Sequence, residues 1–275
     1  MFLVKESKAL SKILKEVVDE IPLNCRGNYQ RNIDTLEIKS DSYKASYAYY
    51  SPKENCIYLN TKEMKNHSFK SQVAFNIFIL KHEINHAFST KYDEETKKVT
   101  SGFGENEFWF LTEGFTDFMS CSINNKVSPK NLAHSLASQL TLIVGENIMM
   151  DAYYNNLGLN PIKEELVRQG IEKKEVDNFF AIYFSIQDQD CKTVHDTLML
   201  IEGMLLNFCD NKLKKLERTN DKRMLLERFK AFLPIQKTLK KNATKYDIRN
   251  NNSYGELNRD YSIMINERLK KLHTG

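Results

Sequence analysis

Residues that break regular structure are scarce in this chain. Ten glycines and five prolines among 275 residues are few for a fold of many short strands, because each strand needs a turn at both ends. The scarcity argues against a β-sandwich and favours helices. An apolar fraction of 41% supports a real core, so broad disorder is not expected.

Paired cysteines and long apolar runs are lacking as well. The cysteines are odd in number and form no C-x-x-C pair, which indicates reduced thiols rather than a disulfide framework or a structural zinc site. Residues 1–20 carry a charge every few positions and contain no signal-peptide core. The longest apolar stretch, residues 73–80, is far below the roughly 20 residues that span a bilayer. We therefore expect a cytoplasmic protein without a membrane span, and export by a signal-independent route stays open.

Positive charge is concentrated in the last quarter of the chain. Residues 211–275 contain 17 Lys and Arg against 7 Asp and Glu, whereas residues 1–210 contain 23 against 29. Such a basic segment after position 210 can bind nucleic acid or an anionic surface. A solvated helical face rich in lysine explains it more simply, since no DNA-binding motif is recognisable there. Nucleic acid is therefore not the expected partner.

The apolar pattern predicts an α+β fold that is mostly helical. Residues 6–20 have helical spacing, and the alternating stretches within residues 34–60 flank a turn at residues 51–55, which predicts a small antiparallel sheet. A long helix is expected over residues 69–88 and a second over residues 112–124.

We expect two parts along the chain. Residues 1–125 would form the core with the N-terminal helix, the sheet and these two helices. Residues 126–275 would form a helical subdomain that closes a cleft, with helices that begin at Ser128-Pro129 and Asn160-Pro161.

The long helix carries the chemistry. Residues 82–86 read His-Glu-Ile-Asn-His, the pattern H-E-x-x-H. Residues four apart on a helix share a face, so both imidazoles can reach one ion. Zinc accepts two such nitrogens among the three protein ligands of a catalytic site. Glu83 lies close enough for its carboxylate to take a proton from a water that the metal activates.

A third ligand is needed, and the second helix offers two carboxylates. The longer metzincin pattern is excluded because Ser89 and Tyr92 stand at its remaining positions. Glu113 and Asp117 are four residues apart and share a helical face. One of them can bind the metal while the other accepts a hydrogen bond from a ligand imidazole.

Residues 82–86 together with residues 112–117, Thr-Glu-Gly-Phe-Thr-Asp, resemble the two-helix signature of the gluzincin zinc peptidases, the thermolysin-like group and its relatives. The resemblance covers about residues 55–125 and implies a zincin-like core. It implies one Zn²⁺ per chain, which His82, His86 and Glu113 would bind. It also implies Glu83 as the general base and Asp117 as the partner that orients His82.

The chain departs from that family in three respects. Thr112 stands where an asparagine is usual, and the downstream histidine motif of thermolysin-like enzymes is absent. The longer spacing from His86 to Glu113 predicts that residues 89–107 form an inserted, mobile lid over the cleft.

A peptidase also needs a donor for the oxyanion. Tyr153 and Tyr154 follow the second helix on a predicted helix at residues 146–156, and only one of them can face a cleft because neighbouring helical positions diverge by about 100°. We favour Tyr153 as the catalytic donor, with His134 as the next candidate.

The expected function is zinc-dependent hydrolysis of peptide bonds in a peptide or protein substrate. The alternative is a regulatory or binding module that keeps a zincin shell and acts through its basic C-terminal segment. The sequence predicts no oligomeric state.

Overall fold

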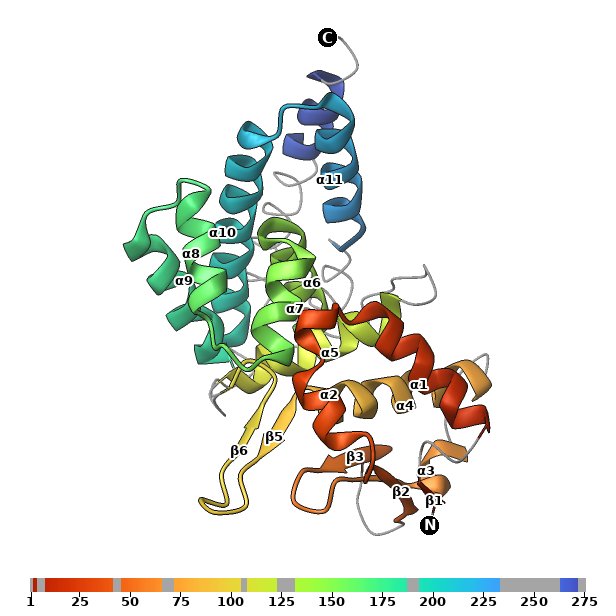
Figure 1. Ribbon diagram of the computed structural model, residues 1–275. Helices are drawn as coiled ribbons and strands as arrows, with labels where there is room; N and C mark the ends of the chain where they lie inside the picture. Colours follow the sequence, from red (N-terminus) through yellow and green to blue (C-terminus); the bar gives the residue numbers. More distant parts are fainter. Residues whose placement is uncertain are drawn as a thin grey trace. The chain divides into compact units, whose positions relative to one another are not determined.

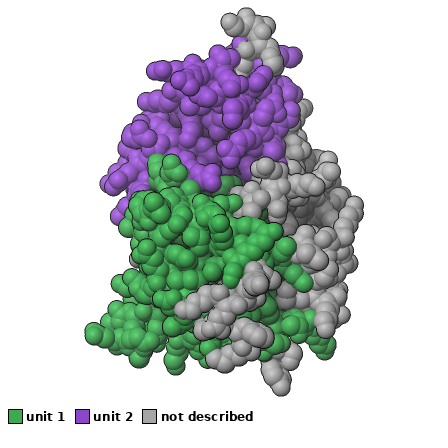
Figure 2. All heavy atoms as spheres, turned by 45° about the vertical axis from the view of Figure 1, so that its right-hand side comes forward, with its two compact units in different colours: residues 1–127, 147–159 green, residues 128–146, 160–275 purple. Residues whose placement is uncertain are grey.

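The computed structural model divides into two compact units, coloured green and purple in Figure 2. Unit 1 comprises residues 1–127 and 147–159, and unit 2 comprises residues 128–146 and 160–275. Most of the described chain is helical, and every described strand lies in unit 1. The α+β, mostly helical class is therefore confirmed. The structure describes residues 2–3, 8–41, 46–65, 72–104, 108–122, 132–186, 193–232 and 263–271.

The sequence suggested two consecutive segments. In the structure, each unit instead contains two separate stretches of the chain. The chain leaves unit 1 at residue 127, close to the expected boundary at residue 125, but residues 147–159 return to it. This return has a physical cause. Helix α7 (Glu146–Tyr154) carries Tyr153 and Tyr154, two large side chains that are fully buried in the core of unit 1.

A four-stranded sheet forms one layer of unit 1 in the order β1 (Phe2–Leu3), β2 (Glu37–Ser40), β4 (Cys56–Leu59) and β3 (Ala48–Ser51). The predicted antiparallel pair is confirmed as β3 and β4. Strand β1 is antiparallel to β2, but β2 runs parallel to β4, which the sequence did not predict. Strand β4 is one of the two inner strands, and its residues Cys56 and Ile57 are fully buried.

Helices α4 (Gln72–Phe88) and α5 (Trp109–Ser122) pack together beside the sheet, and α4 also contacts β3. The apolar face of α4 includes Ile84, Ala87 and Phe88, which are fully buried. Helix α1 (Lys8–Glu20) covers another side of α4 (Figure 1), where Lys81 Nζ lies 2.7 Å from Glu16 Oε2.

Short elements complete unit 1. A hairpin of β5 (Thr90–Tyr92) and β6 (Val99–Ser101) projects from the end of α4 (Figure 1). Asp93 shapes its turn, because Asp93 Oδ1 accepts the backbone N–H groups of Glu95 and Thr96 at 3.0 and 2.9 Å. The remaining elements are η2 (Leu23–Cys25), α2 (Gly27–Asn32) and α3 (Thr61–Lys65).

Unit 2 is a group of helices around α6 (Leu132–Val144). Helix α6 is buried from His134 to Val144, including its polar residues, which marks it as the central helix of this unit. Among the described residues, no helix is long and apolar enough to cross a membrane. The other helices are α8 (Asn160–Arg168), α9 (Lys173–Ser185), α10 (Thr193–Lys215), α11 (Thr219–Phe232) and residues 263–271.

The predicted helix starts have mixed outcomes. Helix α8 begins at Asn160, as the Asn-Pro pair indicates. Residues 128–129 lie outside the described residues, so their predicted start is not tested.

Candidate metal centre

Three side chains from α4 and α5 converge in unit 1. His82 Nε2 lies 3.0 Å from His86 Nε2 and 3.4 Å from Glu113 Oε2. His86 Nε2 lies 3.2 Å from Glu113 Oε1. These residues, which the sequence predicted as ligands, form a group that could hold a metal ion, because each offers one ligand atom to the same point.

The end of α4 is fixed by side chains that bind its last carbonyl groups. Thr90 Oγ1 donates to the carbonyl of His86 at 2.6 Å, and Asn32 Nδ2 donates to the carbonyl of Ala87 at 2.6 Å. Such bonds replace the helical partners that the last turn lacks. They end the helix directly after the motif and hold the backbone of His86 in place.

Asp117 orients the first imidazole. Its Oδ1 lies 2.9 Å from His82 Nδ1, and a carboxylate can only accept, so Nδ1 carries the hydrogen. In the neutral ring this assignment leaves a lone pair on Nε2, which points at His86 and Glu113. Asp117 is 7% exposed, so water competes little for this bond.

The close approach of these side chains shifts the pKa values of His82 and Glu113. Burial lowers the pKa of His82, but its hydrogen bonds to Asp117 and Glu113 outweigh burial and raise the pKa to about 10. Burial raises the pKa of Glu113, but its hydrogen bonds to the two imidazoles outweigh burial and hold the pKa well below its ordinary value. The carboxylates of Asp117 and Glu113 therefore favour positive charge on the ring of His82, and the same negative charges would favour a metal cation between the three side chains.

Zinc fits this arrangement. Its tetrahedral ligands at about 2.0–2.1 Å stand about 3.3 Å from one another, and the three separations here are 3.0, 3.2 and 3.4 Å. Two imidazoles and one carboxylate are also the donor set of many catalytic zinc sites. A proton on one ring can bridge only two of these groups, whereas a metal ion can bind all three at once.

Comparison with protein-family models, curated proteins and solved structures returns no significant match. The candidate site therefore rests on its own geometry.

The cluster opens into a pocket with two walls of different origin. His82, Glu83, His86 and Glu113 line it, and the cavity has a volume of about 300 Å³. Strand β3 supplies one wall with residues 48–50 and the following Pro52. Thr90 and Ser101, at the base of the β5–β6 hairpin, supply the other. The sequence did not identify the residues of either wall, although the alternation within residues 90–92 and 99–101 was a signal for the strands of the second wall.

Glu83 lies in this pocket beside the ligands. Its side chain is 7% exposed, and burial raises its pKa against the nearby His82 and His86, which lower it. A backbone hydrogen bond from Tyr50 of β3 also reaches it. A buried carboxylate with a raised pKa, in a cleft beside a candidate cation site, has the properties of a general base.

The structure places Tyr153 in the core instead of in this pocket. It is fully buried, and its hydroxyl lies 2.5 Å from Thr116 Oγ1. Its ring packs against Phe103 and Phe115, and it is not among the residues that line the pocket. This position does not support the predicted role as oxyanion donor, because the packing of α7 turns its ring towards α5.

The two alternative donors are buried as well. The hydroxyl of Tyr154 donates to Asn85 Oδ1 at 2.6 Å on the back of α4. His134 is fully buried in α6 of unit 2.

The structure describes residues 89–104 of the predicted lid, which contain the β5–β6 hairpin, whereas residues 105–107 lie outside the described residues. Asn156 Nδ2 donates to the carbonyls of Ser89 and Gly102 at 2.7 and 2.9 Å. Phe103, which follows, is fully buried. The side chain of Thr112, at the position where the related motif has asparagine, accepts the backbone N–H of Phe103 at 3.4 Å. Thr112 thus helps to hold the hairpin.

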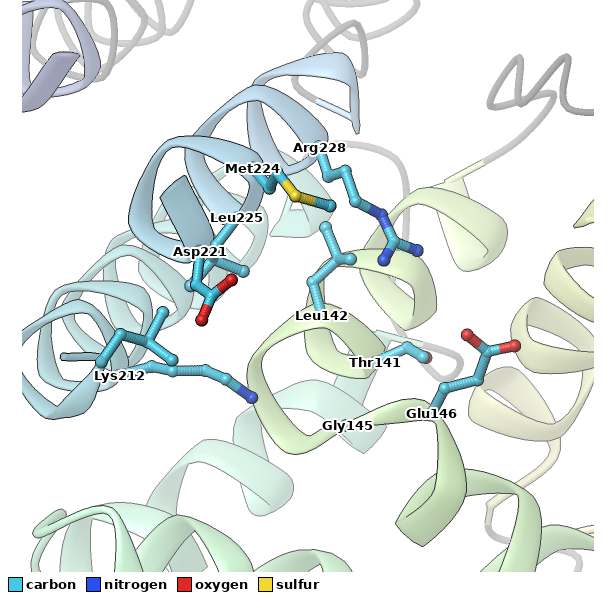
Figure 3. A pocket seen from close by; sticks show the side chains of 10 residues that line it. Thr141, Leu142, Gly145, Glu146, Lys212, Asp221, Met224, Leu225 and Arg228 are labelled. Carbon is cyan, nitrogen blue, oxygen red and sulfur yellow. The ribbon is translucent and has the colours of Figure 1, made fainter. Parts of the chain in front are cut away.

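A second cavity, of about 240 Å³, lies in unit 2. Figure 3 shows Lys212 and Asp221 on one side and Glu146 on the other. Lys212 Nζ donates to the carbonyl of Ile143 near the end of α6, and burial lowers its pKa. Lysine at a helix C-terminus stabilises its last carbonyls, so Lys212 has a structural role and the mixed charges select no ligand.

Proposed function

We propose that this protein is a zinc-dependent peptidase. The observation that carries the proposal is the convergence of His82, His86 and Glu113 at ligand spacing, with Glu83 buried beside them in one pocket. Structural zinc sites use all four positions for protein ligands, whereas catalytic sites keep one position open. Three ligands next to an accessible pocket therefore favour catalysis.

Each residue of the site would have a separate role in the reaction. When bound, zinc supplies a Lewis acid and lowers the pKa of water towards 7. His82 and His86 would bind it through Nε2, and Asp117 would hold the ring of His82 through Nδ1. The carboxylate of Glu83 would accept a proton from the attacking water and transfer it to the leaving amine.

An extended peptide suits the wall formed by β3. This strand is the last in the order of the sheet, and among the described residues it pairs with β4 alone. Its outer edge faces the pocket, since residues 48–50 line the cavity. A peptide can add to such an edge through backbone hydrogen bonds, which would bring its carbonyl groups past Glu83.

Metal content and peptide cleavage test the proposal together. We expect about one zinc per chain in the purified protein, and its loss in His82→Ala and Glu113→Ala. Glu83→Gln should keep zinc because Glu83 is not a ligand, yet lower kcat by about 10²–10⁴ because the proton acceptor is gone. The measurements are mass spectrometry of the bound metal and cleavage of a peptide mixture.

Glu94→Gln is the matched control. Glu94 lies at the tip of the hairpin with its side chain 78% exposed, so the same change of charge should alter neither zinc nor cleavage. A zinc-loaded protein whose cleavage of peptides does not depend on Glu83 would show that this proposal is wrong.

A further inference from the structure

The β5–β6 hairpin presents two distinct faces. Its register pairs Thr90 with Ser101, Lys91 with Thr100 and Tyr92 with Val99. Side chains alternate between the faces of a strand. The pair Tyr92–Val99 therefore lies on the same face as Thr90–Ser101, while Lys91 and Thr100 lie on the other.

Hydrogen bonding supports this assignment. Asp93 N–H donates to the carbonyl of Lys98, and Gly102 N–H donates to the carbonyl of Ser89. Bonded pairs alternate with non-bonded pairs in an antiparallel ladder, so Thr90–Ser101 and Tyr92–Val99 are non-bonded pairs, in which side chains stand closest. The hydroxyl oxygens of Thr90 and Ser101 are indeed 2.7 Å apart.

The face that meets the pocket becomes apolar away from the metal ligands. Thr90 and Ser101 line the pocket. The next pair outwards on this face is Tyr92, which is half-buried, and Val99, which is 41% exposed. An aromatic and a β-branched residue in direct register form a compact apolar surface. This surface is continuous with the wall of the pocket.

We propose that Tyr92 and Val99 are specificity-determining residues that contact an apolar side chain of the substrate. This inference rests on the proposed function. The pair lies two residues beyond the pocket wall, which is about 6.6–6.8 Å along a strand. An extended substrate whose cleaved bond lies beside Thr90 and Ser101 would cover that distance in two residues, which places the preferred apolar residue about two positions from the cleaved bond.

A peptide side chain suits this surface better than a second copy of the chain does. A stable dimer buries about 800 Å² on each partner, far more than two side chains provide. One substrate side chain matches the size of the pair.

The test compares cleavage preferences in hairpin variants. The double variant Tyr92→Thr/Val99→Thr places a β-branched residue, which suits a strand, at both positions but removes most of the apolar surface. The single variant Val99→Thr changes the chemistry while keeping the shape. Lys91→Thr, on the opposite face of the same hairpin, is the matched control, and Tyr92→Phe should preserve the effect.

The readout is the ratio of kcat/KM for two peptides that differ by Leu or Ala at the position two residues from the cleaved bond. One or two methylene groups in an apolar site change such ratios by about tenfold or more. We expect a preference for Leu of about tenfold in the unaltered protein, in Lys91→Thr and in Tyr92→Phe. It should fall to about one in the double variant and be reduced in Val99→Thr.

Binding gives an independent measurement in the Glu83→Gln background, where the peptides stay intact. The Kd for the Leu peptide should rise in the double variant and stay unchanged in Lys91→Thr. Cleavage that depends on Glu83 but shows the same Leu preference in the double variant would overturn this inference alone. A double variant that changes the oligomeric state but not the preference for Leu would also overturn this inference. Absence of Glu83-dependent cleavage would overturn the proposed function and this inference with it.

Discussion

At the scale of single residues, Asp117 shows how one acceptor sets the properties of a metal ligand. Its carboxylate holds His82 Nδ1 at 2.9 Å and thereby directs the lone pair of Nε2 into the site. In Asp117→Asn the amide can still accept, but it lacks the charge that makes the imidazole a strong ligand. We expect zinc affinity to fall by about 10–100-fold, measured by competition with a chelator.

Asp177→Asn is the control for this change. Asp177 is paired with Lys163 on the surface of unit 2, so its loss should leave zinc affinity unchanged. Equal affinities in Asp117→Asn and the unaltered protein would remove Asp117 from the site.

Tyr153 and Tyr154 give a second prediction, which concerns stability. In Tyr153→Phe, Thr116 Oγ1 keeps its bond to the carbonyl of Thr112 at 2.7 Å. The free energy of unfolding should therefore fall by only about 1 kcal/mol. In Tyr154→Phe, buried Asn85 Oδ1 loses its hydrogen-bond donor. The free energy of unfolding should fall by about 1–3 kcal/mol. Urea unfolding should rank the variants in this order, and both should retain peptide cleavage. A hundredfold loss of activity in zinc-loaded Tyr153→Phe would restore it as the oxyanion donor.

These residues also show what the sequence could predict. Helical spacing places His82 and His86 on one face and Glu113 and Asp117 on another, so the members of each pair were predictable from local geometry. The direction in which the Tyr153 side chain points was not predictable from local geometry. Its helix could turn either tyrosine to the pocket, and the choice depends on packing against Phe103 and Phe115, which are far away in sequence.

At the scale of elements, asparagine side chains join segments that are distant in sequence. Asn156 adopts a positive φ of 56° and clamps both ends of the hairpin base. In Asn156→Gly the backbone conformation remains accessible but the clamp is lost. We expect faster hydrogen exchange at Gly102 and in β5 and β6, by about tenfold for each 1.4 kcal/mol of lost local stability.

Lys97→Gly is the matched control at the tip of the same hairpin. Lys97 also has a positive φ, of 57°, and its side chain is 67% exposed. Glycine there removes backbone strain without removing a clamp, so exchange at the hairpin base should stay slow. Fast exchange at the base in the unaltered protein would instead agree with the mobile lid that the sequence suggested.

Pairings between elements were harder to predict than the elements themselves. The polar residues of segment 89–107 suggested a loop, but residues 90–101 form a hairpin whose turn Asp93 shapes, and the buried Phe103 follows it. The sequence could not reveal that β2 lies parallel to β4, because a short strand does not specify its neighbour. Long-range contacts decide such pairings.

At the scale of the whole molecule, the excess of positive charge after residue 210 is partly neutralised within unit 2. Asp210 pairs with Lys214 at 2.7 Å and with Arg268. These ion pairs make a nucleic-acid surface less favourable, since Asp210 opposes the basic charge around it. A regulatory module that acts through this segment stays a hypothesis, and titration with duplex DNA at two salt concentrations would test it.

The buried thiols give the last prediction, which concerns stability at alkaline pH. The free cysteines of the described residues are all buried, at positions 25, 56, 121 and 209. Burial, reinforced by the charge of Asp210, raises the pKa of Cys209 from 9.0 to about 12. Burial beside Asp151 likewise raises the pKa of Cys25 to about 11. The folded state therefore keeps protons that the unfolded chain releases above pH 9.

The sign of the effect follows from linkage. Where the folded state binds more protons than the unfolded chain, the free energy of unfolding falls as pH rises. The contribution of Cys209 is fully present below pH 9 and is lost as pH rises towards 12. Between pH 8 and pH 10 its loss amounts to about 1.4 kcal/mol. Urea unfolding under reducing conditions should show this decline, and Cys209→Ala should show a shallower one, because it lacks this thiol while every other titrating group is common to both proteins. Parallel declines would mean that Cys209 ionises as easily in the folded protein as in the unfolded chain.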